Sequence, residues 1–422
     1  MSRIIVGLEI GTSCIRCVIG QINEDDHLEI IGAAKRPSNK GLQKGVIVNI
    51  GAAMSAIKET IDDASVMAGV DVHSVYVAIG GVHVEGRCRS GGIPVDTTNR
   101  NRRLEISNEN KKHAIDSAIA VFLPMDKQIL HAIPQEYKID EISGYKDPIG
   151  NLGVRLDVSV FLVTASKTAC ATIGECLSRA GLDVDGIYLK TLAEAEATLN
   201  TEEMELGSIL IDIGADSTDA MVIYNGAPIY ITSVPVGGNL VTSDIAQVKG
   251  IPRSVAEEIK IQYGCCWIEG NEAEEEVIIR EIGSRPAELT TRYDLCAIIQ
   301  PRMAEIMTMI RREIVKHSGL KELSGSIVVT GGGALMPGVR NLTQSIWGTE
   351  SVRLGECADY GRLPGDAGFM YRKADFATAV GLVVSVKNSE KKQSKTVNSK
   401  RESSGEKIGF VDKVKEIWQK FF

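Results

Sequence analysis

Several residue types and patterns are scarce in this 422-residue chain. Aromatic residues make up only 5% of the sequence, which argues against a stacking platform for single-stranded nucleic acid. The six histidines are dispersed, and no H-E-x-x-H or paired Cys/His spacing occurs, so we expect no zinc site. No apolar run approaches the ~20 residues of a membrane span, and the N-terminus has no apolar signal region.

Charge and cysteine content narrow the class of protein further. The net charge of −8 does not suit a polyanion-binding body, and we expect no nucleic-acid partner. Nine scattered cysteines, an odd number, indicate a reducing compartment rather than a disulfide scaffold. The sulfurs of Cys14 and Cys17 would point to opposite faces of a strand, which favours strand filling over a redox pair. The length allows two or more domains with large cores.

The stretch Ile209–Ile223, ILIDIGADSTDAMVI, predicts a hairpin of two strands joined by a tight turn of small residues. Glycine at such a turn lets backbone N–H groups approach an anion. Asp212, at the end of the first strand, could hold a hydrated Mg²⁺ beside that anion. Buried hairpins also carry Asp and Gly at their turns for structural reasons alone, so this motif leaves both interpretations open.

A second copy of the pattern strengthens the functional interpretation. Ile4–Glu9 is followed by Gly11, Thr12 and Ser13 and by another apolar run, and aligning Glu9 with Asp212 places Gly11 on Gly214. Internal repetition of this kind indicates two similar domains. Two facing turns of N–H groups would clamp a polyphosphate, so the duplication favours nucleotide binding.

A third glycine-rich element lies in Ser326–Val339, SIVVTGGGALMPGV. Three glycines, Gly331 to Gly333, after a buried strand would let a flat ligand lie on bare backbone. The run is not G-x-G-x-x-G, so it does not support a dinucleotide fold. Two helices of small residues, Thr191–Leu199 and Phe376–Val386, could cross at a hinge between two domains.

The remaining pattern predicts alternating helices and strands, interrupted by one insertion. A helix at Ile50–Ala68 and a strand at Ser74–Ile79 indicate an α/β domain. Residues 82–163 resemble an α+β insertion that begins with the turn-rich Gly91–Pro94 and carries no catalytic constellation, which suits a partner surface. On the helix Arg253–Tyr263, the charges alone predict a solvated face.

The end of the chain has a different composition. Asn388–Lys407 is rich in Ser and Lys and predicts a disordered linker. The last residues, GFVDKVKEIWQKFF, would form a helix with one apolar face, flanked by lysines: Phe410, Val411, Val414, Ile417, Trp418, Phe421 and Phe422, with Lys413, Lys415 and Lys420 beside them. From Lys387 onward ten Lys/Arg stand against five Asp/Glu, which suits insertion into an anionic membrane surface. Docking on the protein's own core or on a partner groove is the alternative.

Taken in order, these elements resemble the actin and DnaK-chaperone superfamily of ATP-binding proteins. Within it, ILHAIPQEYKID in the insertion, VGGNLVTSDIA, AEEIKIQYG and VVTGGGALMPGV are similar to the FtsA family of bacterial cell-division proteins. The resemblance runs from about Ile4 to Val386 and on to the tail. It implies an α/β, actin-like two-domain ATPase fold with an inserted α+β subdomain (1C, SHS2-like) and a C-terminal amphipathic helix.

The resemblance also implies a division into subdomains. We expect subdomain 1A to comprise residues 1–81, 164–199 and 360–387, with subdomain 1C inserted at 82–163. Subdomain 2A would comprise residues 200–226 and 302–359, and subdomain 2B residues 227–301. A disordered linker at 388–408 and a membrane-targeting amphipathic helix at 409–422 would complete the chain.

The cofactors implied are ATP and Mg²⁺. The nucleotide-binding residues carried over from the family are Gly11, Thr12, Ser13, Gly214, Ala215, Asp216, Ser217, Gly238, Asn239, Glu257, Lys260, Gly331, Gly332 and Gly333. Glu9 and Asp212 would face the metal through water. For Glu257 and Lys260 the resemblance, placing them beside base and ribose, replaces the solvated-face prediction.

Three departures from the superfamily concern catalysis. Glu9 stands where Asp is usual, and the second loop reads GADST rather than a GGGT pattern, so Asp216 adds negative charge near a triphosphate. Lys190 stands where the chaperones place a glutamate. Binding needs only the N–H cradles and Mg²⁺, whereas hydrolysis needs a positioned water or base. We therefore expect ATP binding with slow or no turnover and name no catalytic residue.

The resemblance implies a polymerising adaptor that anchors FtsZ filaments to the cytoplasmic face of the inner membrane at the division site, within the Z ring and divisome. Expected partners are the FtsZ C-terminal tail, docking on 2B and on Arg302, further copies of the chain, the anionic membrane, and later division proteins at the 1C-like insertion. A cytoskeletal or pilus-assembly adaptor of the same superfamily is the closest alternative, and a small-molecule kinase is a more distant one.

Overall fold

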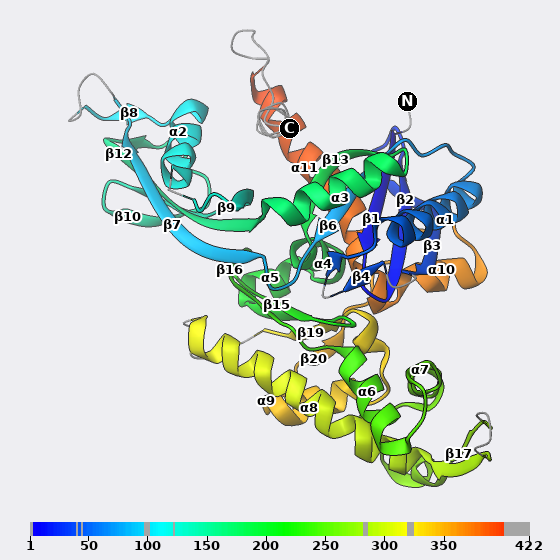
Figure 1. The fold of residues 1–422 in the computed structure, drawn as a ribbon. Coiled ribbons are helices and arrows are strands. Elements are labelled where there is room, and N and C mark those ends of the chain that lie inside the picture. The colour runs from blue at the N-terminus through cyan, green and yellow to red at the C-terminus, as the bar shows by residue number, and fades with distance from the viewer. Residues whose placement is uncertain are drawn as a thin grey trace. The chain divides into compact units, whose positions relative to one another are not determined.

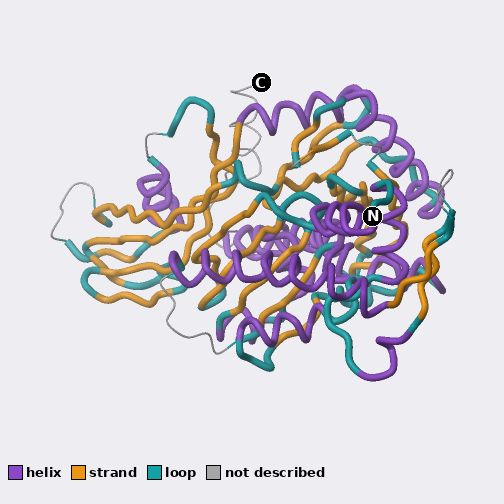
Figure 2. Tube along the Cα trace, turned by 60° about the horizontal axis from the view of Figure 1, so that its bottom comes forward, coloured by secondary structure: helices purple, strands orange, loops and turns teal. Residues whose placement is uncertain are grey.

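The computed structural model describes residues 3–38, 41–43, 45–96, 102–120, 123–281, 286–318 and 325–400, with the side chains of 271–272 and 390–400 left aside. The chain divides into two units, Met1–Val384 and Ser385–Phe422. The first unit contains two five-stranded sheets, each covered by helices (Figures 1 and 2).

The first sheet has the strand order β13-β6-β1-β2-β3. The hairpin β1 (Arg3–Ile10) and β2 (Cys14–Ile22) continues into β3 (Leu28–Pro37), while β6 (Ser74–Ile79) runs parallel to β1 and β13 (Asp183–Leu189) parallel to β6. Helix α1 (Ile50–Ala68) packs on β3 and β2 and ends at Gly69 in the left-handed conformation. The predicted first hairpin, helix and strand are confirmed.

The second sheet repeats this plan, with the order β16-β15-β14-β19-β20. The hairpin β14 (Ser208–Ile213) and β15 (Thr218–Tyr224) continues into β16 (Ala227–Val234), while β19 (Ile327–Thr330) runs parallel to β14 and β20 (Val352–Leu354) parallel to β19. The internal repeat predicted from the two acid–glycine hairpins is therefore a repeat of three-dimensional structure.

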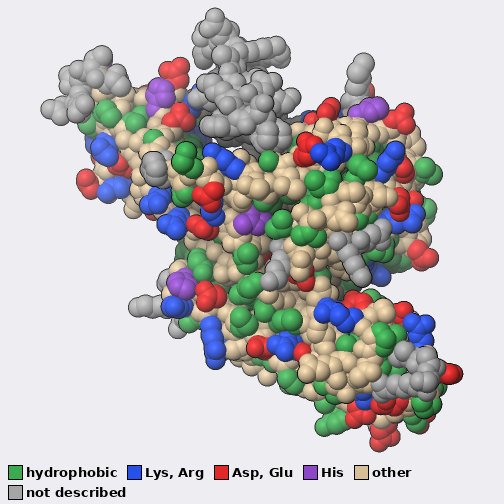
Figure 3. All heavy atoms as spheres, viewed as in Figure 1, with side chains coloured by type: hydrophobic (Ala, Val, Ile, Leu, Met, Phe, Trp, Pro, Cys, Tyr) green, Lys and Arg blue, Asp and Glu red, His purple; other side chains and the backbone are tan. Residues whose placement is uncertain are grey.

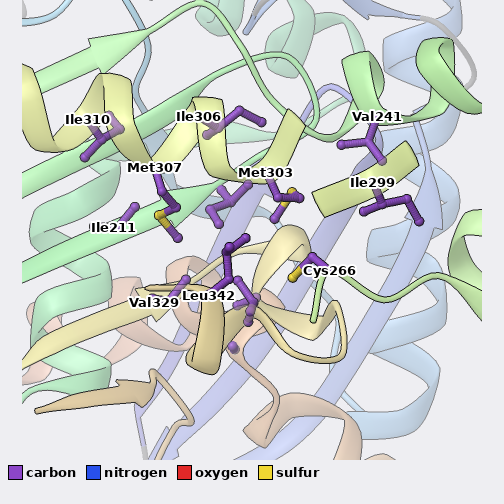
Figure 4. Packing of buried hydrophobic residues seen from close by; sticks show 14 of the residues in the cluster. Ile211, Val241, Cys266, Ile299, Met303, Ile306, Met307, Ile310, Val329 and Leu342 are labelled. Atoms are coloured by element: carbon purple, nitrogen blue, oxygen red, sulfur yellow. The ribbon is translucent and has the colours of Figure 1, made fainter. Parts of the chain in front are cut away.

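Helices cover the second sheet and form its core. Helix α8 (Arg292–His317) places Met303 and Met307 against the sheet residues Ile211 and Val329, and α9 (Val339–Trp347) adds Leu342 (Figure 4). Both methionines are buried in this core, and Met303 also lines the cavity described below. The remaining elements at this end are α6 (Gly238–Lys249), α7 (Arg253–Tyr263) and the hairpin β17 (Glu276–Ile279) and β18 (Glu288–Thr291).

The insertion forms a four-stranded sheet of order β10-β9-β12-β7, with α2 (Asn108–Ile119) packed on it (Figure 1). Its strands are β7 (Glu85–Pro94), β9 (Lys127–Ile139), β10 (Ile142–Tyr145) and β12 (Arg155–Ser166), with β8 (Leu104–Glu105) and β11 (Leu152–Gly153) paired separately. The turn predicted at Gly91–Pro94 is wrong, because these residues belong to β7. A Cβ on Gly91 would lie 2.2 Å from the backbone nitrogen of Ala118. Glycine at this position therefore allows α2 to pack closely on β7 and does not mark a turn in the chain.

Two helices of small residues cross closely, as expected. Helix α4 (Lys190–Thr198) approaches the start of α11 (Ala377–Lys400) so tightly that a Cβ on Gly381 would lie 1.9 Å from the carbonyl oxygen of Ala193. The Thr378 hydroxyl donates a hydrogen bond of 2.7 Å to Glu194 Oε1 across the same crossing. The first unit also contains helices α3 (Lys167–Arg179), α5 (Thr201–Leu206) and α10 (Gly365–Arg372) and the short strand pair β4 (Leu42–Gln43) and β5 (Val46–Ile47).

The disordered linker predicted from residue 388 is wrong for its first part, because α11 continues to Lys400. A helix that is already formed extends at low cost through Lys, Glu and Gln, which are good helix formers. The amphipathic segment 409–422, with all its predicted membrane-facing residues from Phe410 to Phe422, lies outside the described residues. Among those described, no helix is long and apolar enough to span a bilayer.

Candidate functional site

One cavity of about 300 Å³ brings together every residue predicted to contact nucleotide or metal. Its walls come from the turns of both hairpins, the start of α6, helix α7 and the Gly331–Gly333 turn. The surface is hollowed between the lobe that carries α1 and the lobe that carries α7 (Figure 3). Residues from distant parts of the sequence thus meet at one place. Arg302, which was predicted to contact FtsZ, does not line this cavity.

The first turn is shaped by Gly11. Its N–H donates to the carbonyl oxygen of Cys14 at 3.1 Å, and a Cβ at this position would lie 2.7 Å from that same oxygen. The Thr12 hydroxyl oxygen accepts a hydrogen bond of 3.2 Å from the backbone nitrogen of Gly45, while Ser38 donates to the Thr12 carbonyl. The turn is therefore held from outside, and its inner face is left to the cavity.

The second turn has the same geometry. The N–H of Gly214 donates to Ser217 O at 2.9 Å, and its own carbonyl accepts from the N–H of Gly238 at 2.9 Å. A Cβ on Gly237 would lie 2.6 Å from the Gly214 carbonyl oxygen, so this close approach of two backbone segments requires glycine. The start of α6 is thus fixed directly against the turn.

Asp216, the extra acid in this turn, has a partner. The side-chain amide of Asn239 donates to Asp216 Oδ1 at 2.7 Å, and the Asn239 N–H donates to the Ala215 carbonyl at 2.8 Å. These bonds orient the Asp216 carboxylate toward α6.

The charged pair on α7 faces the cavity, so the solvated face predicted from pattern alone is wrong for these two residues. Lys260 Nζ donates to Glu257 Oε2 at 2.7 Å, to Thr242 Oγ1 at 2.9 Å and to the Gly238 carbonyl at 3.2 Å. These three acceptors, which the helix pattern could not reveal, draw the lysine inward. Both residues line the cavity, and their contact with base and ribose stays a prediction.

The turn Gly331–Gly333 lines the cavity with backbone atoms alone. Gly331 has φ of +80°, and a Cβ there would lie 2.0 Å from Asp212 Oδ1. A Cβ on Gly333 would lie 2.3 Å from Ile213 Cγ2, whereas one on Gly332 would meet no atom within 4 Å. The turn therefore packs on β14 at its ends and leaves its middle residue open to the cavity.

The two acids that end β1 and β14 face each other across an ammonium group. Lys190 Nζ lies 2.5 Å from Asp212 Oδ2, 3.4 Å from Glu9 Oε1 and 4.0 Å from Glu194 Oε1. Burial alone would lower the pKa of Lys190, but the charges of these three carboxylates raise it well above its ordinary value. Burial raises the pKa of Asp212 to about 6 and that of Glu194 well above its usual range.

Further charged residues at this end were missed from the sequence. Arg16 is buried and pairs with Glu9 at 3.2 Å and with Asp375 at 3.0 Å, while Lys35 pairs with Asp375 at 2.7 Å. Asp219 also lines the cavity. The signal available in the sequence was a charged Arg16 within the mostly apolar strand β2, because a buried charge needs a partner.

The donor set fits a hydrated Mg²⁺ better than a fully protein-bound metal. Among the described residues no group of three or more His, Cys, Asp or Glu side chains is arranged to hold a metal ion. Asp212 Oδ1 is buried without a hydrogen-bond partner in the described part of the chain. Mg²⁺ binds through one or two carboxylates and keeps water and phosphate as its other ligands, which suits Asp212 and Glu9.

Arg302 lies on α8 and is engaged within the chain. Its guanidinium binds Asp244 with two contacts of 2.6 and 3.1 Å and also pairs with Glu305. The Arg302 side chain is 29% exposed.

Two facing sheets that each end in an acid–glycine hairpin, with a cavity between them, define the actin-like ATPase fold. Solved structures agree: a chain of the PilM–PilN type IV pilus biogenesis complex matches with TM-score 0.62 at 19% identity, covering 90% of this chain and 98% of that one. MreB5 of Spiroplasma citri bound to ADP matches with TM-score 0.54 at 14% identity, covering 92% and 98%.

Sequence comparison identifies the family within this fold. The family model for cell division protein FtsA matches residues 209–381, and that for the SHS2 domain inserted in FtsA matches 81–164. Cell division protein FtsA of Borreliella burgdorferi is 40% identical over 82% of this chain and 83% of its own, and that of Escherichia coli K12 is 33% identical over 90% of each. The chain belongs to the FtsA family of cell-division proteins.

Proposed function

We propose that this protein binds ATP, with Mg²⁺, in the cavity between its two sheets. The observation that carries the proposal is the meeting of two hairpin turns and a triple-glycine turn around one cavity of about 300 Å³. The two turns would hold the phosphates by backbone N–H groups, and Gly332 would lie under the flat adenosine. Glu257 and Lys260 would flank the base and ribose.

The bound metal ion would neutralise phosphate charge and orient the terminal phosphate. Glu9 and Asp212 are the residues that would hold its water ligands. Lys190, which occupies the place where related chaperones have a glutamate, stays protonated because its pKa is raised by the surrounding carboxylates, so it cannot accept a proton from water. We therefore expect binding with slow turnover.

Equilibrium binding of radiolabelled ATP in excess Mg²⁺ tests this proposal. Asp212→Asn keeps the shape of the side chain but removes its charge, and we expect it to weaken binding about threefold, because one charge near the metal is lost. Lys58→Gln on the exposed face of α1 is the control and should leave binding unchanged. No saturable binding of ATP or ADP to the folded wild-type protein would refute the proposal.

In the cell, we propose that the protein polymerises and tethers FtsZ filaments to the cytoplasmic face of the membrane at the division site. Membership of the FtsA family supports a role in division. The basic, apolar sequence of 409–422 supports the membrane contact, and weak binding by each chain would be multiplied in a filament. The insertion would receive later division proteins.

We place the FtsZ tail on the lobe that carries α6, α7 and the start of α8, with Arg302 as one contact. Arg302→Glu should abolish FtsZ binding, but it would also break the pair with Asp244. The doubly substituted Arg302→Asp, Asp244→Arg restores that pair in reverse and should still fail to bind FtsZ. Recovery of FtsZ binding in this swap would show that Arg302 acts only through the local fold.

A further inference from the structure

The cavity contains a cation of its own, contributed by Lys190. This residue begins α4 in the first half of the molecule, while its ammonium reaches Asp212, at the end of β14 in the second half, at 2.5 Å. The distance to Glu9 Oε1 is 3.4 Å and that to Glu194 Oε1 is 4.0 Å. A single ammonium group is therefore surrounded by carboxylates from both halves.

The position of this ammonium is fixed by its surroundings. The lysine stem passes close to Gly80, where a Cβ would lie 3.1 Å from Lys190 Cβ, so the bare glycine leaves room for it. The preceding residue is anchored as well, because the backbone N–H of Leu189 donates to His131 Nε2 at 2.9 Å. The Lys190 side chain is only 18% exposed. These contacts give the lysine little freedom to withdraw from the acids.

We propose that the Lys190 ammonium acts as a fixed positive charge in the nucleotide site. Because of this charge, nucleotide binding depends only weakly on Mg²⁺. This inference rests on the proposed ATP site. Without this ammonium, Asp212 and the neighbouring Asp219 would face the phosphates as negative charges, because the buried Arg16 pairs only with Glu9 among these three acids. The ammonium offsets part of this repulsion, which would otherwise have to be offset by the metal ion.

ATP binding to the wild type and to the Lys190 variants should respond differently when Mg²⁺ is chelated. Replacing Mg²⁺ by excess EDTA should weaken radiolabelled ATP binding to the wild type less than about tenfold. In Lys190→Met the same change should weaken it about 100-fold, since one unit charge several ångströms from a phosphate has an effect of that size at intermediate dielectric. Lys190→Arg retains the charge and should behave as the wild type does. Surface Lys58→Gln is the neutral control.

Lys190→Met leaves buried acids without their partner, so this variant could fail to fold. A second, matched pair of variants therefore accompanies it. Glu194→Gln and the double variant Lys190→Met, Glu194→Gln differ only in the ammonium, and both lack one of the acids it neutralises. The Gln side-chain oxygen can still accept the hydrogen bond from Thr378. The double variant should lose at least tenfold more affinity on chelation than Glu194→Gln. Thermal melting verifies that both proteins are folded.

The outcomes separate the inference from the proposal beneath it. A larger loss on chelation in the variants without the ammonium supports the inference. Equal losses in every variant that binds ATP with Mg²⁺ overturn it and leave the ATP site standing. If the folded wild type binds no ATP even with Mg²⁺, the proposed site is wrong and the inference falls with it.

Discussion

Gly331 combines two constraints that few positions in the site share. Its φ of +80° disfavours any residue with a Cβ, and that Cβ would collide with Asp212 Oδ1 at 2.0 Å. The neighbouring Gly332 carries neither constraint, because a Cβ there meets no atom within 4 Å. The two glycines therefore have different roles, although the sequence presents them as one run.

Alanine substitutions should distinguish these roles. Gly331→Ala is expected to lower the free energy of unfolding by about 2 kcal/mol, from backbone strain and the displaced carboxylate. Gly332→Ala should change it by less than about 0.5 kcal/mol and should weaken ATP binding instead, because its methyl group enters the cavity. Urea denaturation and ATP binding measured on both variants test this, and equal destabilisation would contradict it.

The side chain of His131 should make the stability of the fold depend on pH. Burial lowers its pKa to about 4, and its Nε2 must stay unprotonated to accept the hydrogen bond from Leu189. The unfolded state takes up the proton near pH 6.5, so stability is full above that pH and is lost as the pH falls toward 4.

Between pH 7 and pH 5 this one residue should reduce the free energy of unfolding by up to about 2 kcal/mol. His131→Gln removes the titration, so the difference between variant and wild type should shrink by that amount over the same range. Urea denaturation at the two pH values gives both quantities, and parallel pH profiles would refute the assignment.

The glycines and the paired acids of the site could be predicted because each belongs to a short local pattern. The ion pairs that these acids form with Arg16 and Lys190 could not. Arg16 pairs with Asp375, which lies 359 positions away in the sequence, and Lys190 meets Asp212 only when the two halves fold together. Such contacts depend on tertiary structure rather than on the residue's own neighbours.

Among the secondary-structure elements, the crossing of α4 and α11 depends most on the absence of side chains. A Cβ on Gly381 would lie 1.9 Å from the carbonyl of Ala193, and one on Gly7 in β1 would lie 2.4 Å from the carbonyl of Ala379. Helix α11 is therefore in close contact with both a helix and the first sheet at its start.

Gly381→Ala should push these helices apart and lower the free energy of unfolding by about 2 kcal/mol or more, as expected for overpacking. Gly51→Ala, on an exposed turn of α1, is the matched control and should be neutral or stabilising by up to about 1 kcal/mol. Thermal or urea denaturation compares them. A Gly381→Ala protein as stable as the control would show that the crossing can relax.

Long periodic elements were predicted well, and the failures have local causes. Helices α1 and α7 have the bounds predicted for them, Ile50–Ala68 and Arg253–Tyr263. Strand β7 was mistaken for turns because Gly91 serves a neighbouring helix, which sequence spacing does not reveal. Helix α11 was ended too early, because polar composition was given more weight than helix propensity.

At the scale of the whole molecule, the repeat is the main organising feature. Each half presents a hairpin turn, and the cavity exists only where both meet. The insertion at 81–164 matches the SHS2 domain of FtsA, and family membership gives the structure its place in cell division. We propose that membrane attachment, FtsZ binding and nucleotide binding are combined in this one protein.

Co-sedimentation of FtsZ with anionic vesicles, in the presence of this protein and ATP, tests most directly whether the protein links FtsZ to a membrane. Controls are a chain ending before Gly409 and the variant Trp418→Glu, which puts a charge on the predicted apolar face. We expect FtsZ to pellet with the intact protein and to stay in solution with either control. If the intact protein pellets while FtsZ stays in solution, the adaptor role is contradicted, and if neither pellets, the membrane helix is contradicted too.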